Sequence, residues 1–170
     1  DATAAEKAAR FLQICDAFSL PVLSLTDTPG FMVGPDSEVQ GAVRRMSSLF
    51  LAGSQLRVPM VAIFLRKAYG LGAMAMTGGS FVAPVYAAAW PTGEVGGMGL
   101  EGAVRLGFKK DLEAQQDAQL REQLFQQLVA RMYEVGKASE AASYLELDAV
   151  IDPSATRAVV LRALAAARNR

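Results

Sequence analysis

The feature that most constrains the fold of this chain is an apolar run that passes straight into a turn containing glycine. Residues 58–65, Val-Pro-Met-Val-Ala-Ile-Phe-Leu, have the length and composition of a buried strand. Residues 66–76 follow and end in Gly-Leu-Gly-Ala-Met-Ala-Met, which is compatible with a helix. Where a strand gives way to a helix, the first N–H groups of the helix have no partner and can bind a negatively charged oxygen. This stretch therefore predicts an anion-binding turn.

Strand-like and helix-like segments alternate over the rest of the chain. Strands are expected at residues 21–26, 58–65, 85–90 and 149–151, and helices at residues 3–18, from Asp36 or Ser37 to Leu56, at 102–108, at 120–136 and from Pro153 onward. Such alternation is typical of an α/β fold in which helices are layered on a sheet. A length of 170 residues is expected to give a single domain with one sizeable core.

Several kinds of chemistry are excluded by what the sequence lacks. It has no histidine, so a Ser-His-Asp triad, a histidine zinc site and an imidazole base are impossible, and no metal site is expected. The single cysteine, Cys15, lies among apolar residues at helical spacing and is expected in the core. One cysteine cannot form an internal disulfide, which fits a reducing compartment, and we expect a cytoplasmic protein.

Composition also bears on the partners of the chain. Hydrophobic residues make up 52% of the sequence and the formal net charge is +0, so neither a nucleic-acid surface nor a basic membrane patch is indicated. No apolar run reaches the roughly 18 residues that a membrane span needs. A mean hydropathy of +0.22 is high, so part of the apolar surface is expected to contact another subunit or domain.

Turns rich in glycine or containing Pro-Gly follow the predicted strands, at residues 27–31, 70–73 and 93–99. In open α/β sheets ligands bind where strands finish and helices begin, although glycines also allow close packing of helices on strands. The pattern Gly70-x-Gly72-x-x-Ala75 loosely matches a dinucleotide fingerprint. However, residues 66–69 separate it from the predicted strand and no acidic residue ends the next strand, so a dinucleotide site is not expected.

These motifs occur together in one known family. Four segments of the chain resemble the carboxyltransferase (β) subunit of biotin-dependent acyl-CoA carboxylases of the propionyl-CoA and acetyl-CoA type. They are residues 66–70 with the turn after them, residues 27–31 (Asp-Thr-Pro-Gly-Phe), residues 89–94 (Ala-Trp-Pro-Thr-Gly-Glu) with Met98 and Gly99, and residues 151–153 (Ile-Asp-Pro) with Thr156 and Arg157. The resemblance covers nearly the whole chain in order. It implies a crotonase-like α/β fold of stacked ββα units. Because the chain is similar to the second, biotin-side domain of that family, residues 1–170 are expected to be the C-terminal domain of a longer, two-domain chain.

The resemblance also implies a reaction. Members of this family transfer CO₂ from carboxybiotin to the α-carbon of a short acyl-CoA, and biotin itself can serve as the base. Biotin is carried by a partner, the biotin carboxyl carrier protein with its biotin carboxylase subunit, and is not attached to this chain. The other implied partners are the N-terminal carboxyltransferase domain and further copies of the chain. Neither nucleic acid nor a membrane is expected as a partner.

Site residues are implied position by position. The backbone N–H groups of Leu71 and Gly72 match those that hold the biotin oxyanion in the family. The residues expected around biotin and substrate are Gly30, Phe31, Gly70, Ala73, Met74, Pro91, Thr92, Glu94 and Gly97. Propionyl-type members often carry an acidic residue at the position of Met74, so the acyl chain length stays open. The oxyanion hole for the thioester belongs to the other domain in this family.

Two other functions remain compatible with the sequence. One is a crotonase-superfamily hydratase, decarboxylase or hydrolase that acts on an acyl-CoA, for which Glu94 and Glu101 are the nearest candidate carboxylates. The other is a non-enzymatic domain whose apolar faces serve only assembly. Biotin binding without thioester turnover would favour the carboxyltransferase half-site, turnover by this chain alone would favour the second function, and neither activity would favour the third.

Overall fold

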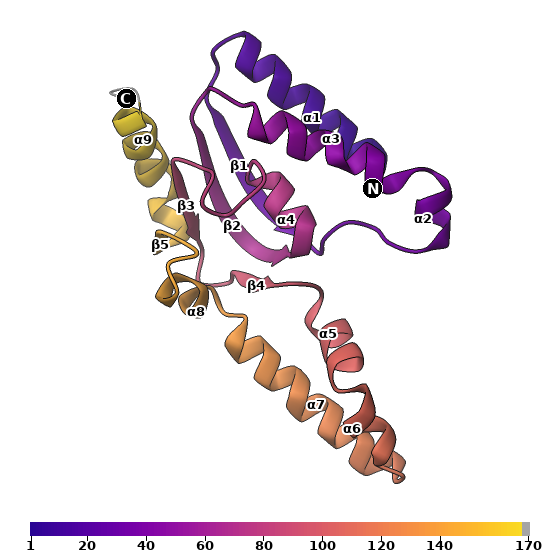
Figure 1. Ribbon diagram of the computed structural model, residues 1–170. Coiled ribbons are helices and arrows are strands. Elements are labelled where there is room, and N and C mark those ends of the chain that lie inside the picture. The colour runs from indigo at the N-terminus through magenta and orange to yellow at the C-terminus, as the bar shows by residue number, and fades with distance from the viewer. Residues whose placement is uncertain (168–170) are drawn as a thin grey trace.

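A computed structural model describes residues 1–167 (Figure 1). Its helices are α1 (Ala2–Ala17), α2 (Pro35–Val39), α3 (Ala42–Ser54), α4 (Gly70–Met76), α5 (Leu100–Gly107), α6 (Lys109–Ala114), α7 (Ala118–Val135), α8 (Ala138–Ser143) and α9 (Thr156–Ala167), with a 3₁₀ helix, η1 (Pro153–Ala155), before α9. Its strands are β1 (Val22–Thr28), β2 (Met60–Tyr69), β3 (Tyr86–Ala89), β4 (Glu94–Gly96) and β5 (Ala149–Val150). The α/β class predicted from the sequence is confirmed.

The sheet is organised around the long strand β2. Its order is β1-β2-β3-β5, β4 pairs with β2 as well, and every pair is parallel. Strand β3 pairs with the first half of β2, from Val61 opposite Tyr86 to Phe64 opposite Ala89. Strand β4 pairs with the end of β2, where Tyr69 lies opposite Gly96. The carboxyl ends of β1, β2 and β4 therefore meet at one edge of the sheet, beside α4 (Figure 1).

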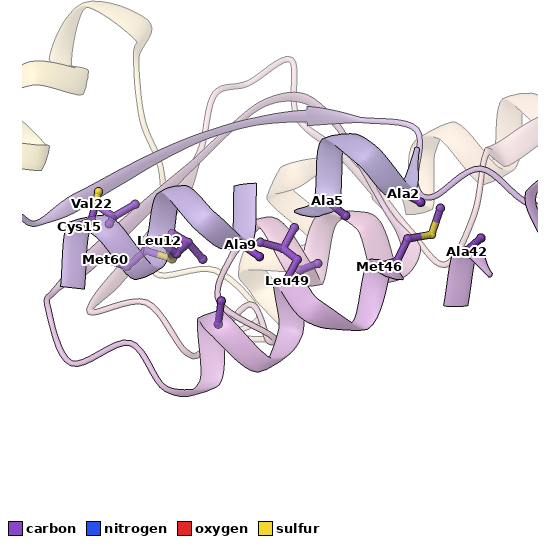
Figure 2. Packing of buried hydrophobic residues seen from close by; sticks show 12 residues of the cluster. Ala2, Ala5, Ala9, Leu12, Cys15, Val22, Ala42, Met46, Leu49 and Met60 are labelled. Atoms are coloured by element: carbon purple, nitrogen blue, oxygen red, sulfur yellow. The ribbon is translucent and has the colours of Figure 1, made fainter. Parts of the chain in front are cut away.

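Helices α1 and α3 cover one face of the sheet and pack against each other (Figure 2). The side chains that α1 buries there are Ala2, Ala5, Ala9, Leu12 and Cys15. Because three of them are alanines at helical spacing, α3 approaches closely, and its Met46 and Leu49 fill the remaining space. Val22 and Met60, which lie opposite each other at the starts of β1 and β2, complete this cluster. The predicted burial of Cys15 is confirmed.

Helix α9 covers the other face of the sheet, over β2 and β3. Its Val160 packs among buried side chains of these two strands, and the indole Nε1–H of Trp90 donates to Thr156 Oγ1 at 2.9 Å. Strand β1 is not covered in the same way. Its outward-facing Leu23 and Leu25 are 44% and 51% exposed.

Helices α5, α6 and α7 form an arm that extends from β4 away from the sheet (Figure 1). The arm has its own core, in which Val104, Phe125 and Val129 are buried. A backbone hydrogen bond of 2.7 Å from Val95 N–H to the Gly136 carbonyl joins the end of α7 to β4. None of the helices in residues 1–167 has the length and apolar character that crossing a membrane requires.

One predicted helix differs in its course. The helix expected from Asp36 or Ser37 to Leu56 is two helices, because Gly41 adopts a left-handed conformation (φ 68°) between α2 and α3. The cap position of α2 is occupied by Gly34 and not, as predicted, by Asp36 or Ser37. Three short elements, β4, α6 and α8, were not predicted, since none has more than six residues and none shows a full hydrophobic period.

Candidate functional site

The strand-to-helix turn lies at the end of β2, which runs to Tyr69 and passes directly into α4 at Gly70. The expectation that residues 66–69 separate the strand from this glycine is wrong, because pairing with β4 extends β2. Spacing therefore does not count against a dinucleotide fingerprint. The lack of an acidic residue at the end of the next strand still counts against a dinucleotide site, because β3 ends at Ala89 and is followed by Trp90.

Asp27 fixes the end of β1 against β2. The register of the two strands shifts between Thr26 and Thr28, on either side of this residue. Its carboxylate accepts hydrogen bonds from the Lys67 N–H at 3.0 Å and from the Arg66 guanidinium at 3.1 Å. Burial opposes ionisation of the Asp27 carboxyl, but these hydrogen bonds outweigh it and hold its pKa below the ordinary value. Asp27 therefore anchors the end of β1 to β2.

The turns predicted after β1 and β2 and the loop around β4 meet through their glycines. A Cβ atom added to Gly72 would lie 2.8 Å from the Cα of Gly30, and one added to Gly70 would lie 2.7 Å from the carbonyl oxygen of Gly97. No side chain fits at such distances. Gly70 also has a φ of 57°, which favours glycine. The structure thus brings together four of the predicted site residues by direct backbone contact.

The first turn of α4 presents backbone donors at this meeting point. Leu71 and Gly72 are the second and third residues of the helix, so their N–H groups have no acceptor one turn earlier within the helix. Among the residues that the structure describes, no side chain caps this turn. Gly72 is buried, whereas Leu71 is 61% exposed. Such donors, shielded on one side and open on the other, suit a negatively charged oxygen.

Two carboxylates near the turn are held by tyrosines. Tyr69 is 2% exposed and donates its hydroxyl to Glu94, while the Tyr133 hydroxyl donates to Glu101 at 2.8 Å. Burial, together with the Glu94 carboxylate, raises the pKa of Tyr69. The Glu101 N–H and the Tyr133 hydroxyl hold the pKa of Glu101 below its ordinary value. Both carboxylates thus already have a tyrosine hydroxyl as a hydrogen-bond donor within the chain.

Other predicted pocket residues have visible structural roles. Ala73 is fully buried in a core cluster, and Met74 is half-buried on the next turn of α4. Pro91 and Thr92 lie in the exposed turn after β3, where the Thr92 hydroxyl donates to the Leu65 carbonyl at 2.5 Å. Their contact with a ligand remains a prediction.

A cavity beside the turn was not predicted from the sequence. Its volume is about 190 Å³, and the apolar side chains that line it include Phe31, Met32, Val43, Met46, Phe50 and Leu71. It lies where α2 and α3 diverge at Gly41. In the sequence the α3 residues are simply the apolar stripe of one long helix. The glycine that interrupts the helix was the one available signal.

Comparison with known proteins identifies the family. A model of the carboxyl transferase domain matches residues 1–170. The chain belongs to the carboxyl transferase family. The propionyl-CoA carboxylase beta chain of Saccharopolyspora erythraea is 39% identical over 169 residues, which are 96% of this chain and 30% of that relative. The chain thus spans about a third of the length of this curated relative.

Solved structures of this family confirm the crotonase-like α/β fold. A single-chain, multi-domain long-chain acyl-CoA carboxylase is 59% identical with a TM-score of 0.85, over 95% of this chain and 16% of that one. The 12S transcarboxylase, a hexamer solved with methylmalonyl-coenzyme A and methylmalonic acid bound, is 32% identical with a TM-score of 0.88, over 100% of this chain and 32% of that one. The carboxyl transferase chain described here is therefore similar to one segment of larger enzymes.

Proposed function

We propose that this carboxyl transferase domain is the biotin-side half-site of a biotin-dependent acyl-CoA carboxylase. The observation that carries the proposal is the first turn of α4, which presents the N–H groups of Leu71 and Gly72 where Gly72 meets the backbone of Gly30 and Gly70 meets that of Gly97, in a member of this family. When bound, biotin supplies the carboxyl group that is transferred. Its ureido oxygen fits this turn, since that oxygen needs N–H donors.

The role of this chain is to hold negative charge. The Leu71 and Gly72 N–H groups are fixed before reaction by the helix and by the close contact with Gly30. Preorganised donors of this kind typically contribute about 3–4 kcal/mol each to the stability of a developing oxyanion. A backbone donor does not depend on its side chain, so the leucine at position 71 is compatible with the role. Phe31 adjoins these donors, because its backbone nitrogen lies 3.0 Å from the Cβ position of Gly72.

The thioester side of the reaction needs the second domain. We propose that residues 1–170 work as one domain of a two-domain carboxyltransferase chain, in which the other domain holds the thioester oxygen of acyl-CoA. The coverage of about a third of the Saccharopolyspora relative supports this. The carrier of biotin is a partner, the biotin carboxyl carrier protein with its biotin carboxylase. The hexameric assembly of the 12S transcarboxylase supports a homo-oligomer. The cytoplasmic location stays a prediction.

The acyl group is proposed from the same comparisons. The relatives described above differ in their names, propionyl in one and long-chain in another. We propose an acyl-CoA whose α-carbon accepts the carboxyl group, with short acyl chains as the minimal substrate.

Carboxyl transfer in reverse tests the proposal. The complete chain that contains this domain, and residues 1–170 alone, are incubated with malonyl-CoA or methylmalonyl-CoA and free biotin. We expect carboxylation of biotin only by the complete chain, with loss of activity in Gly72→Pro, which deletes one N–H and also disturbs the contact with Gly30. Thioester turnover by residues 1–170 alone would contradict the half-site assignment, because it would require a complete thioester site in this domain.

A further inference from the structure

Tyr69 is the last residue of β2 and stands directly before the first turn of α4. Its backbone is extended (φ −108°, ψ 131°), whereas that of Gly70 is left-handed (φ 57°). The chain therefore changes direction between these two residues, and a rotation of Tyr69 would displace the N–H groups of Leu71 and Gly72. Tyr69 is 2% exposed, so its side chain is enclosed by the surrounding elements.

The ring of Tyr69 lies across β4. Tyr69 is the Cα partner of Gly96, and its Cδ1 atom lies 3.5 Å from the position that a Cβ of Gly96 would take. The lack of a side chain at Gly96 thus leaves room for the ring. The hydroxyl reaches Glu94, two residues earlier on the same face of β4. A buried tyrosine hydroxyl needs such a partner, and a carboxylate is a strong acceptor.

Glu94 belongs to the segment that meets α4 from the other side. Three residues later, the Gly97 carbonyl oxygen lies 2.7 Å from the Cβ position of Gly70. Strand β4 is also anchored away from β2, because the Ala138 N–H at the start of α8 donates to the Gly93 carbonyl at 2.9 Å. The tyrosine hydroxyl is therefore bonded to a strand that is held on both sides.

We infer that Tyr69 is a positioning residue, whose hydrogen bond to Glu94 fixes the first turn of α4 so that the N–H groups of Leu71 and Gly72 point at one oxygen. The inference rests on the proposed function and adds a residue that acts through the backbone donors. A phenylalanine would fill the same space but would leave the turn less firmly held. Because a displacement of about 1 Å at a reaction centre can cost about a hundredfold in rate, the bond is expected to affect kcat.

A second tyrosine–glutamate pair supplies a matched control. Tyr133 of α7 donates its hydroxyl to Glu101 of α5 at 2.8 Å. This bond has the same chemistry as the first, but it links two helices of the arm. Tyr133→Phe therefore deletes the same hydroxyl without loosening the residue that precedes α4.

Kinetics of the complete chain in carboxyl transfer from malonyl-CoA to free biotin test the inference, with the folded fraction of each variant measured by circular dichroism. We expect Tyr69→Phe and Glu94→Leu to lower kcat about ten- to a hundredfold and the double variant to lose no more than the worse single one. The KM of malonyl-CoA should stay within about twofold, since the thioester is proposed to bind the other domain. Tyr133→Phe should lower kcat less than about twofold.

The conservative variant Glu94→Gln separates the hydrogen bond from the charge. Its amide oxygen still accepts a hydrogen bond, so kcat should fall less than about fivefold. Because Glu94 is only half-buried, its two variants test the bond even where Tyr69→Phe folds poorly.

A further measurement asks whether Tyr69 acts through the backbone donors. In a chain that carries an ester in place of the Leu71 amide, Tyr69→Phe should lower kcat less than about threefold, because one of the donors that it aims is already absent. A purely structural role of Tyr69 would give the same loss with and without the ester.

Three results would overturn the inference. They are a loss of kcat in Tyr69→Phe no greater than in Tyr133→Phe, an equal loss in Glu94→Gln and Glu94→Leu, and an equal effect of Tyr69→Phe with and without the ester. The second of these would mean that the Glu94 carboxylate acts on the reactants directly. A wild-type chain that transfers no carboxyl group would instead overturn the proposed function, and the inference with it.

Discussion

At the scale of single residues, Gly70 and Gly72 matter because a side chain at either position would prevent a close backbone contact. They let the start of α4 touch the backbones of two other loops, and this contact aims the N–H groups of the turn. The donors belong to the main chain, so the identity of the residue matters through the space it takes and the φ it allows. Mutational effects at this site should therefore follow backbone geometry more than side-chain chemistry.

Gly70→Ala should lower the free energy of unfolding by more than about 2 kcal/mol. A left-handed conformation alone costs an alanine about 1–2 kcal/mol, and the new Cβ would lie 2.7 Å from the Gly97 carbonyl oxygen. Chemical denaturation measures the change. The control is Gly102→Ala in α5, where a Cβ meets nothing within 4 Å; there alanine should be neutral or stabilising by up to about 1 kcal/mol. Equal effects of the two substitutions would contradict the close-contact role of Gly70.

Tyr69→Phe should make the protein less stable at pH 8 and less sensitive to alkali. Losing the hydroxyl leaves Glu94 without its donor, at a cost of about 1–3 kcal/mol. Folding raises the pKa of Tyr69 above the ordinary value of about 10. The contribution of this tyrosine is therefore fully present below about pH 10 and is lost as the pH rises through its folded-state pKa. Denaturation at pH 8 and pH 11 compares the variant with wild type, and Tyr144→Phe, at an exposed tyrosine, is the control. If wild type and Tyr69→Phe lost the same free energy of unfolding between pH 8 and pH 11, this role of the Tyr69 hydroxyl would be refuted.

At the scale of elements, the sheet with its two helical layers and the arm have separate cores. Helices α1 and α3 depend on their alanine-lined contact, whereas the arm depends on α5 packing against α7. Such an arrangement allows the arm to open locally while the sheet stays intact.

Phe125→Ala tests this separation. Phe125 is 7% exposed and lies at the centre of the arm core with Val104 and Val129, and truncation of a buried phenylalanine typically costs about 3–5 kcal/mol. We expect faster amide hydrogen exchange across residues 100–135 and unchanged exchange in α1 and α3. Leu120→Ala, at a residue of the same helix that is 49% exposed, should change little. Equal acceleration in the sheet and the arm would show that they open as one unit.

The sequence allowed the long, periodic elements to be predicted and missed what depends on tertiary contact. Helices α1 and α7 have clear hydrophobic periods and were predicted close to their observed bounds. Strand β2 continues past Leu65 through Arg66 and Lys67 because β4 pairs with it, which no local pattern indicates. The break at Gly41 was missed because the apolar residues on both sides keep one helical period. The cavity was missed with it.

At the scale of the whole molecule, the chain exposes several apolar surfaces in addition to the proposed half-site. Leu23 and Leu25 of β1, Phe11 of α1 and Phe18, which follows α1, are exposed. Apolar surface of this extent is typical of a protein that meets other domains or subunits. The proposed division of labour is that this domain holds the negative charge on biotin while the rest of the enzyme holds the thioester. In the proposed reaction, catalysis depends on two backbone N–H groups of α4.

Replacing the Leu71 amide by an ester tests this dependence, since it changes the N–H to an oxygen and leaves the side chain and shape intact. The measurement is kcat for carboxyl transfer from malonyl-CoA to free biotin by the complete chain. The control is the same ester at Leu51, a leucine of α3 that is 62% exposed and remote from the turn. We expect a loss of about 10²–10³ in kcat at Leu71 and less than twofold at Leu51. A kcat unchanged by the ester at Leu71 would contradict the proposed role of this N–H.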